Sequence, residues 1–185
     1  MKQKRVIIVD GRTGAAQAAY TYMRKHGYET LMLGFEGPIA MAIQSLFALP
    51  HSVAYYVKEE DLDLNCADKL FYGNSYYDVR DMILASQSNE FLGLIASRTI
   101  NTNKFNDAFV FSSCTDVDHA IPVVESVGIE NVCVISCEGG IGIASQLNKL
   151  IPAAKTTTLP TVDSSLLHTL ICGTIKTHFN LEDPA

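Results

Sequence analysis

Short runs of hydrophobic residues recur along the chain and are separated by longer stretches of mixed polarity. The first run, Val6 to Val9, reads Val-Ile-Ile-Val and is followed at once by Asp10-Gly11. A run without polar interruptions is typical of a strand that is buried on both faces, as in a parallel sheet. The sequence predicts further short strands at 30–33, 52–57, 108–111, 132–135 and 156–159.

Stretches with helical character lie between these predicted strands. Residues 13–25 are rich in alanine and contain no proline, and Gly27 follows as a stop signal. Other helices are predicted to start at Gly37-Pro38 and to span 119–127, 141–150 and 166–179. The alternation predicts a doubly wound α/β fold, Rossmann-like or PIN-like, in which three α/β/α layers enclose a mostly parallel sheet. We expect one domain over 1–180 and a frayed tail at 181–185.

The middle of the chain, residues 58–105, is less regular. It contains an acidic run, a tyrosine-rich polar stretch at 72–77 and two segments with helical character at 79–85 and 90–100. We interpret this region as a helical insertion within the same domain.

Composition and charge narrow the possible classes of protein. The 185 residues are 48% hydrophobic and 18% charged, which excludes a disordered or collagen-like chain. Fourteen basic against 20 acidic residues give a net charge of −6, so the chain lacks the basic footprint of proteins that hold nucleic acid through many phosphates. No hydrophobic run approaches the roughly 18 to 20 residues of a membrane span. The five cysteines lack CxxC spacing, so we expect reduced thiols and a cytoplasmic location.

Acidic residues stand directly after two of the predicted strands. Asp10 follows the first strand, and Asp116 and Asp118 follow the strand that ends at Phe111. Ligands of open α/β sheets bind beyond the carboxyl ends of the strands, and Mg²⁺ prefers carboxylate oxygens. The three acids are therefore candidates for a metal site. Taken singly, Asp116 or Asp118 is better explained as the N-cap of the following helix.

Two segments carry a resemblance to a known family. Residues 109–118 read Phe-Val-Phe-Ser-Ser-Cys-Thr-Asp-Val-Asp, and a helix with an early proline, Gly128 and a further strand follow. This region resembles the signature of NYN-type domains in the PIN-like nuclease superfamily, and the opening Val-Ile-Ile-Val-Asp10-Gly11 is similar to that family's first motif. Glu90 stands near the place of a further acid of the family.

The resemblance implies a phosphodiesterase that depends on Mg²⁺ or Mn²⁺ and cleaves a short single-stranded stretch of RNA. Its metal ligands and catalytic groups would be Asp10, Glu90, Asp116 and Asp118. Arg12 and His119 are candidates for contact with a substrate phosphate, and Ser112, Ser113 and Thr115 for orienting a carboxylate. Asp78 and Asp81, which we expect on one helix face, are alternative donors of the fourth carboxylate. A homodimer is compatible with the hydrophobic last helix.

Three other functions remain open. The turn from Cys137 to Gly142 follows a strand and is rich in glycine, so its amides are candidates for holding the phosphate of a nucleotide or another small molecule. Cys114, on a strand-to-helix turn near His119, is a candidate nucleophile of a cysteine hydrolase. A PIN-like interaction module with a degraded site is the third possibility, because Cys114-Thr115 and His119 depart from the family pattern.

Overall fold

The protein is described from a computed structural model, which describes residues 3–11, 13–34, 69–72, 75–78, 89–112, 114, 116–137 and 141–183. Its main sheet has five strands in the order β2-β5-β1-β6-β7, and every neighbouring pair is parallel. The strands are β1 (Arg5–Asp10), β2 (Thr30–Leu33), β5 (Ala108–Phe111), β6 (Val132–Ser136) and β7 (Thr156–Thr158). The predicted parallel α/β fold is confirmed.

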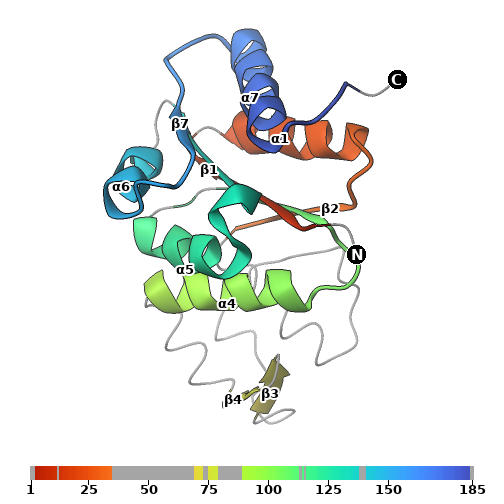
Figure 1. Ribbon diagram of the computed structural model, residues 1–185, viewed down its shortest axis with the longest axis vertical. Coiled ribbons are helices and arrows are strands. Elements are labelled where there is room, and N and C mark those ends of the chain that lie inside the picture. Colours follow the sequence, from red (N-terminus) through yellow and green to blue (C-terminus); the bar gives the residue numbers. More distant parts are fainter. Residues whose placement is uncertain are drawn as a thin grey trace.

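Helices cover both faces of this sheet. Figure 1 shows α1 (Thr13–Lys25) and α7 (Ser164–Phe179) on one face, and α4 (Asn89–Thr102), α5 (Val117–Val127) and α6 (Ile143–Leu150) on the other. A short 3₁₀ helix, η2 (Ile129–Asn131), leads from α5 into β6. Alternate residues of β1 separate the two cores, because Val6 and Ile8 pack with α4, α5 and α6 while Ile7 and Val9 pack with α1 and α7. Burial on both faces explains the uninterrupted hydrophobic run of this strand.

The connections leave neighbouring strands toward opposite faces. The chain passes from β1 through α1 to β2 on one face, and from β5 through α5 to β6 and through α6 to β7 on the other. The strand order therefore reverses at β1, which is the property that defines a doubly wound sheet. The carboxyl ends of β1 and β5 lie side by side at this reversal.

The middle of the chain differs in part from the prediction. The helix expected over 90–100 is confirmed as α4, but the tyrosine-rich stretch forms an antiparallel hairpin of β3 (Lys69–Tyr72) and β4 (Ser75–Asp78). No element was predicted for this stretch itself, but the interpretation of 58–105 as a helical insertion is wrong here, and Asp78 lies at the end of a strand instead of on a helix. The predicted elements at 37, 52–57 and 79–85, and Asp81, lie outside the described residues.

Helices α4 and α5 approach each other closely at Gly93. A Cβ atom at this position would lie 2.6 Å from the carbonyl oxygen of His119 and 2.8 Å from Cγ of Pro122, so a larger residue would force the two helices apart. Further along the two helices, the side-chain amide of Asn101 donates to Ser126 Oγ at 2.6 Å. The two helices thus run in the same direction, and the start of α4 lies beside the start of α5.

The state of the cysteines and the lengths of the helices test the predictions about thiols and membrane spans. Cys114, Cys133 and Cys137 are buried and form no disulfide, as predicted, and Cys172 is half-buried and also free. Cys66 lies outside the described residues. None of the helices in the described part of the chain has the length and hydrophobic content needed to cross a membrane.

Candidate functional site at the carboxyl edge of the sheet

Asp10, at the end of β1, fixes the loop that follows β6. Its side chain is 2% exposed, and both carboxylate oxygens accept hydrogen bonds. Ile141 N–H donates to Oδ1 at 2.9 Å, and Ile143 N–H and the Ser136 hydroxyl donate to Oδ2 at 2.9 and 3.0 Å. The Cys137 amide also donates to the Asp10 carbonyl oxygen at 2.8 Å. These contacts join the ends of β1 and β6 to the start of α6.

Ser136 is a residue of this site that we did not predict. It pairs with Asp10 in the register of β1 and β6, and it is equally buried. Its hydroxyl donates to Asp10 and accepts the Ala144 N–H at 2.9 Å, so it links the carboxylate to the first turn of α6. The sequence does contain a signal for Ser136, namely its position. It ends the hydrophobic run of β6 just as Asp10 ends that of β1.

The glycine-rich turn before α6 binds the carboxylate of Asp10, a side chain of the protein itself. We considered the turn from Cys137 to Gly142 as a phosphate cradle, and residues 138–140 of it lie outside the described residues. The amides of Ile141 and Ile143 donate to the Asp10 carboxylate. A helix N-terminus favours a negative charge, and Asp10 supplies it here. The described part of this turn therefore does not offer those two amides to a ligand.

Asp116 begins α5 as its N-cap. Its Oδ1 accepts the Asp118 N–H at 2.9 Å, and its backbone is extended, as an N-cap requires. The capping role that we predicted as the alternative for Asp116 is confirmed. Asp118 lies in the first turn of the same helix and is exposed. Within the described part of the chain, Asp116 Oδ2 accepts no hydrogen bond, so it is available to a ligand.

Cys114 lies between the end of β1 and the start of α5. Its thiol is 2% exposed and donates to the Asp116 carbonyl oxygen at 3.3 Å. Burial is the main cause that raises the pKa of this thiol to about 12, with the hydrogen bond to Asp116 acting against it and the charges of Asp10 and Asp116 adding to it. A buried thiol that is protonated at neutral pH does not favour the cysteine hydrolase.

Glu90, the fourth predicted ligand, lies near the start of α4, one turn before Gly93. Because Gly93 contacts the backbone of residues 118 and 119, the Glu90 position is level with the first turn of α5. Its side chain lies outside what the structure describes. The fold thus brings the backbone positions of all four predicted acids to one edge of the sheet.

The other predicted site residues divide into three kinds. The hydroxyl of Ser112 donates to the Leu33 carbonyl oxygen at 3.4 Å, and no hydrogen bond from it to a carboxylate is found among the described residues. His119 is 4% exposed and lies against α4, a position that does not meet a substrate from solvent. Arg12, Ser113 and Thr115 lie outside the described residues.

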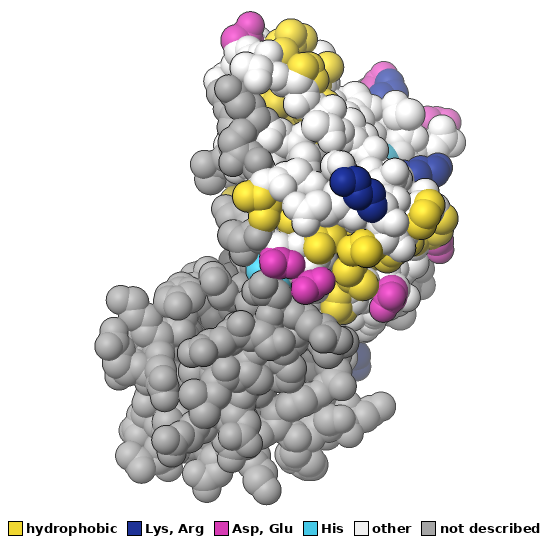
Figure 2. Space-filling view, turned by 90° about the vertical axis from the view of Figure 1, so that its left-hand side faces the viewer, with side chains coloured by type: hydrophobic (Ala, Val, Ile, Leu, Met, Phe, Trp, Pro, Cys, Tyr) yellow, Lys and Arg dark blue, Asp and Glu magenta, His cyan; other side chains and the backbone are white. Residues whose placement is uncertain are grey.

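The fit of these acids to a divalent cation is partial. Among the described residues, no three His, Cys, Asp or Glu side chains are placed to hold a metal ion together. Asp10 already accepts three hydrogen bonds, which leaves one lone pair on Oδ1 for a metal. Asp116 and Asp118 carry the oxygen donors that Mg²⁺ and Mn²⁺ take. Figure 2 faces the side where the strands end and shows acidic and hydrophobic side chains close together on it.

Comparison with known proteins gives a similarity to one solved structure. Neither the models of known protein families nor the curated proteins contain a match to the chain. Among solved structures, the chain is similar to a protein described as a plasmid partition protein of Borrelia burgdorferi B31, crystallised bound to AMPPNP. The likeness covers 97% of this chain and 99% of that one at 10% identity and a TM-score of 0.41. A likeness of this size does not extend the AMPPNP site of that protein to this chain.

Proposed function

We propose that the protein binds a phosphorylated small molecule of the nucleotide class, together with a divalent cation, at the carboxyl ends of β1 and β5. One observation carries this proposal. The connections after these neighbouring strands leave toward opposite faces of the sheet, and ligands of doubly wound proteins bind where that happens.

The start of α1 supplies a place for the phosphate. This helix is 13 residues long, follows β1 after the turn at Gly11, and has no acidic residue in its first turn. A Cβ atom at Gly14 would meet nothing within 4 Å, so the first turn is open. By contrast, the start of α6 is already neutralised by Asp10. The N-terminus of α1 is therefore the better anion site at this edge.

The acids at the start of α5 explain the need for a cation. Asp116 and Asp118 lie close together there, and a phosphate approaching them alone would be repelled. Mg²⁺ is commonly bound through one or two carboxylates together with phosphate oxygens of the ligand. We expect the free oxygen of Asp116 to contact the cation or its water.

Thermal shift and calorimetry test this proposal directly. ATP, GTP, NAD and a sugar phosphate are compared with and without Mg²⁺, and at least one should raise the Tm only when Mg²⁺ is present. Asp116→Asn should abolish the Mg²⁺ dependence. The control is Asp163→Asn, because Asp163 caps α7 through the same kind of bond, to Leu166 N–H at 2.9 Å. If no compound in the panel raises the Tm, the proposal fails.

A second candidate function is the metal-dependent cleavage of RNA that the NYN resemblance implies. The observation in its favour is the convergence of Asp10, the Glu90 position and the start of α5 on one edge. A bound cation would supply an activated water and neutralise the charge that develops on the phosphate. In this function Asp116 would bind the cation, and Asp10 would support the site through the loop that it fixes.

The two candidates are separated by a cleavage assay. Labelled single-stranded RNA is incubated with the protein and Mn²⁺, with Asp116→Asn as the test variant and Asp163→Asn as the control. Metal-dependent cleavage that is lost only in Asp116→Asn supports the nuclease. Cleavage that survives in Asp116→Asn, or that is absent from the unaltered protein, counts against it.

A further inference from the structure

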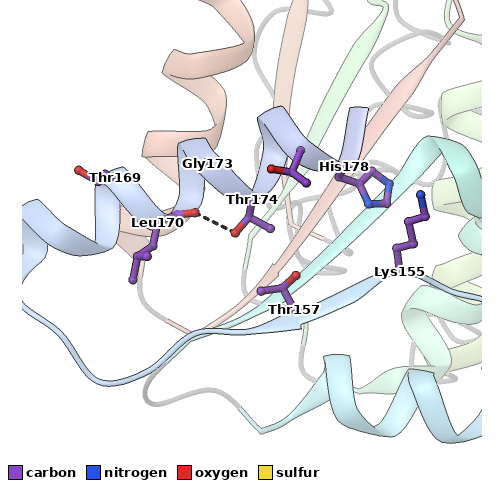
Figure 3. Close-up of a pocket in the computed structure, with 8 residues that line it drawn as sticks. Lys155, Thr157, Thr169, Leu170, Gly173, Thr174 and His178 are labelled. Atoms are coloured by element: carbon purple, nitrogen blue, oxygen red, sulfur yellow. Dashed lines mark hydrogen bonds between the residues drawn. The ribbon is translucent and has the colours of Figure 1, made fainter. Parts of the chain in front are cut away.

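A groove runs along the edge of the main sheet, away from the carboxyl ends of β1 and β5. It has a volume of about 520 Å³ and lies between β7 and α7 (Figure 3). Lys155 and Thr157 line it from the strand side, and Thr169, Leu170, Gly173, Thr174, Thr177 and His178 line it from the helix. We refer to this feature as the β7–α7 groove.

The strand side of the groove has unpaired backbone groups. Within the described chain, β7 is the last strand of its sheet and pairs only with β6. The Leu159 amide donates to the Ser136 carbonyl oxygen at 2.8 Å, and successive amides of a strand alternate in direction. The N–H groups of Thr156 and Thr158 therefore point away from β6, toward the position of an additional strand.

The helix side of the groove is shaped to leave room. Leu170, Gly173, Thr174 and Thr177 recur at helical spacing along one stripe of α7, beside the buried stripe that packs on the sheet. Gly173 has no side chain, and a Cβ atom there would meet nothing within 4 Å. Thr174 and Thr169 donate their hydroxyls to backbone carbonyls of α7, at 2.8 and 3.3 Å. The helix side of the groove therefore leaves space at Gly173 and places threonine hydroxyl oxygens next to that space.

The charge of the groove indicates what it binds. Lys155 is exposed and is the only permanently charged side chain among the described residues that line the groove. Burial lowers the pKa of His178 to about 4, and Lys155 and Arg5 lower it as well, so this ring is neutral at pH 7. A partner with a carboxylate near Lys155 complements this lining, and a basic partner does not.

We infer that the β7–α7 groove binds an extended, acidic peptide segment of another protein, which adds to β7 as a sixth strand. Its backbone pairs with the outward amides of Thr156 and Thr158, and alternate side chains lie over Gly173. A Glu or Asp side chain of the peptide contacts Lys155. This is β-strand addition between an edge strand and a helix, in which the backbone supplies affinity and the groove supplies specificity.

A second copy of this chain fits the groove less well. Two copies joined through β7 would each present Lys155-Thr-Thr-Thr, so neither strand would offer a carboxylate to the other's lysine. Charge complementarity therefore favours a different protein. A dimer formed through β7 remains an outcome that the experiment detects.

The test begins with a displayed library of random nine-residue peptides selected against the full chain. We expect the selected peptides to alternate β-branched residues and to contain Glu or Asp at a fixed place. One selected peptide, made with a fluorescein label, should bind in an anisotropy titration. It should shift the amide resonances of Thr156 and Thr158 in ¹⁵N-labelled protein.

Substitutions then locate the peptide. Lys155→Glu should weaken binding by about tenfold or more, and Lys149→Glu, the same charge reversal on exposed α6, should not. Gly173→Leu should block the groove without unfolding the protein, and Thr158→Pro should remove one outward donor while leaving the bonds to β6. Melting curves check the fold of each variant.

Three results would overturn the inference. The first is that the library yields no acidic, β-branched consensus. The second is that the selected peptide binds Lys155→Glu and Gly173→Leu as tightly as the unaltered protein. The third is that light scattering shows a dimer that Thr158→Pro dissociates, which would assign the edge to a second copy.

Discussion

The contacts of Asp10 predict that this residue contributes more to stability than any surface acid. In Asp10→Ala, the amides of Ile141 and Ile143 and the hydroxyl of Ser136 lose their shared acceptor. Each buried donor left without a partner costs about 1–3 kcal/mol, and Asp10 is 2% exposed, so water does not readily replace it. The Ile143 amide and the Ser136 hydroxyl are buried, whereas the Ile141 bond is only part-buried. We therefore expect a total loss of about 2–6 kcal/mol, a large part of the about 5–15 kcal/mol that holds a typical domain together.

Urea denaturation followed by circular dichroism measures this loss. Asp163→Ala is the matched control, because it removes a capping carboxylate that accepts one amide and is exposed. That loss should be about 1 kcal/mol. Asp10→Asn should fall between the two, since the amide keeps one acceptor oxygen but turns an N–H₂ group toward the remaining donors.

Chelation decides whether the effect belongs to the fold or to a bound metal. We expect the same loss for Asp10→Ala in EDTA and in Mg²⁺, because the three donors belong to the protein. The reasoning would be refuted by a loss no larger than that of Asp163→Ala. A loss that vanishes in EDTA would equally refute it and would assign the carboxylate to a cation.

Three further predictions concern other parts of the molecule. Gly93→Ala should destabilise the protein by about 1–3 kcal/mol in the same assay, because its Cβ would lie 2.6 Å from the His119 carbonyl oxygen. Among the four thiols that the structure describes, a thiol reagent should modify half-buried Cys172 first in the native protein and leave Cys114 unmodified until unfolding, because the pKa of the Cys114 thiol is raised to about 12. The pKa of His178 is lowered from 6.5 to about 4, so the unfolded state binds the proton more readily. Stability should therefore fall as the pH drops from 6.5 toward 4, and His178→Gln should flatten this part of the pH profile of Tm.

The sequence predicts the strands of the main sheet well, for a physical reason. A strand buried on both faces cannot contain polar side chains in its interior, so β1, β5 and β6 are visible as uninterrupted hydrophobic runs. Helices α1 and α5 are followed by the glycines Gly27 and Gly128, whose φ angles are positive, at 77° and 97° respectively.

The tyrosine-rich hairpin was not predicted, although the sequence contains a signal for it. The runs Lys-Leu-Phe-Tyr and Ser-Tyr-Tyr-Asp contain aromatic residues that favour strands, and Gly73-Asn74 stands between them in the sequence. A two-residue connection of this composition is typical of a hairpin.

The roles of the acids could be predicted only in part. Asp116 as an N-cap depends on residues within two positions, which a local pattern contains. The partners of Asp10 lie more than 120 residues away in the sequence, and they depend on the register of β1 against β6. A local pattern can therefore predict that a carboxylate ends β1 but not that α6 uses it.

This difference between the two acids gives a way to separate stability from function at one edge of the sheet. Toward the described residues, Asp10 uses three of its four acceptor positions, and Asp116 uses one. Asp10→Asn should therefore lower the free energy of unfolding by more than it alters metal-dependent ligand binding at a temperature where the variant is folded. Asp116→Asn should do the reverse, because an asparagine still caps a helix but binds a divalent cation weakly. If both variants lose binding equally while folded, Asp10 contacts the ligand or its cation, and its hydrogen bonds to α6 orient it for that contact.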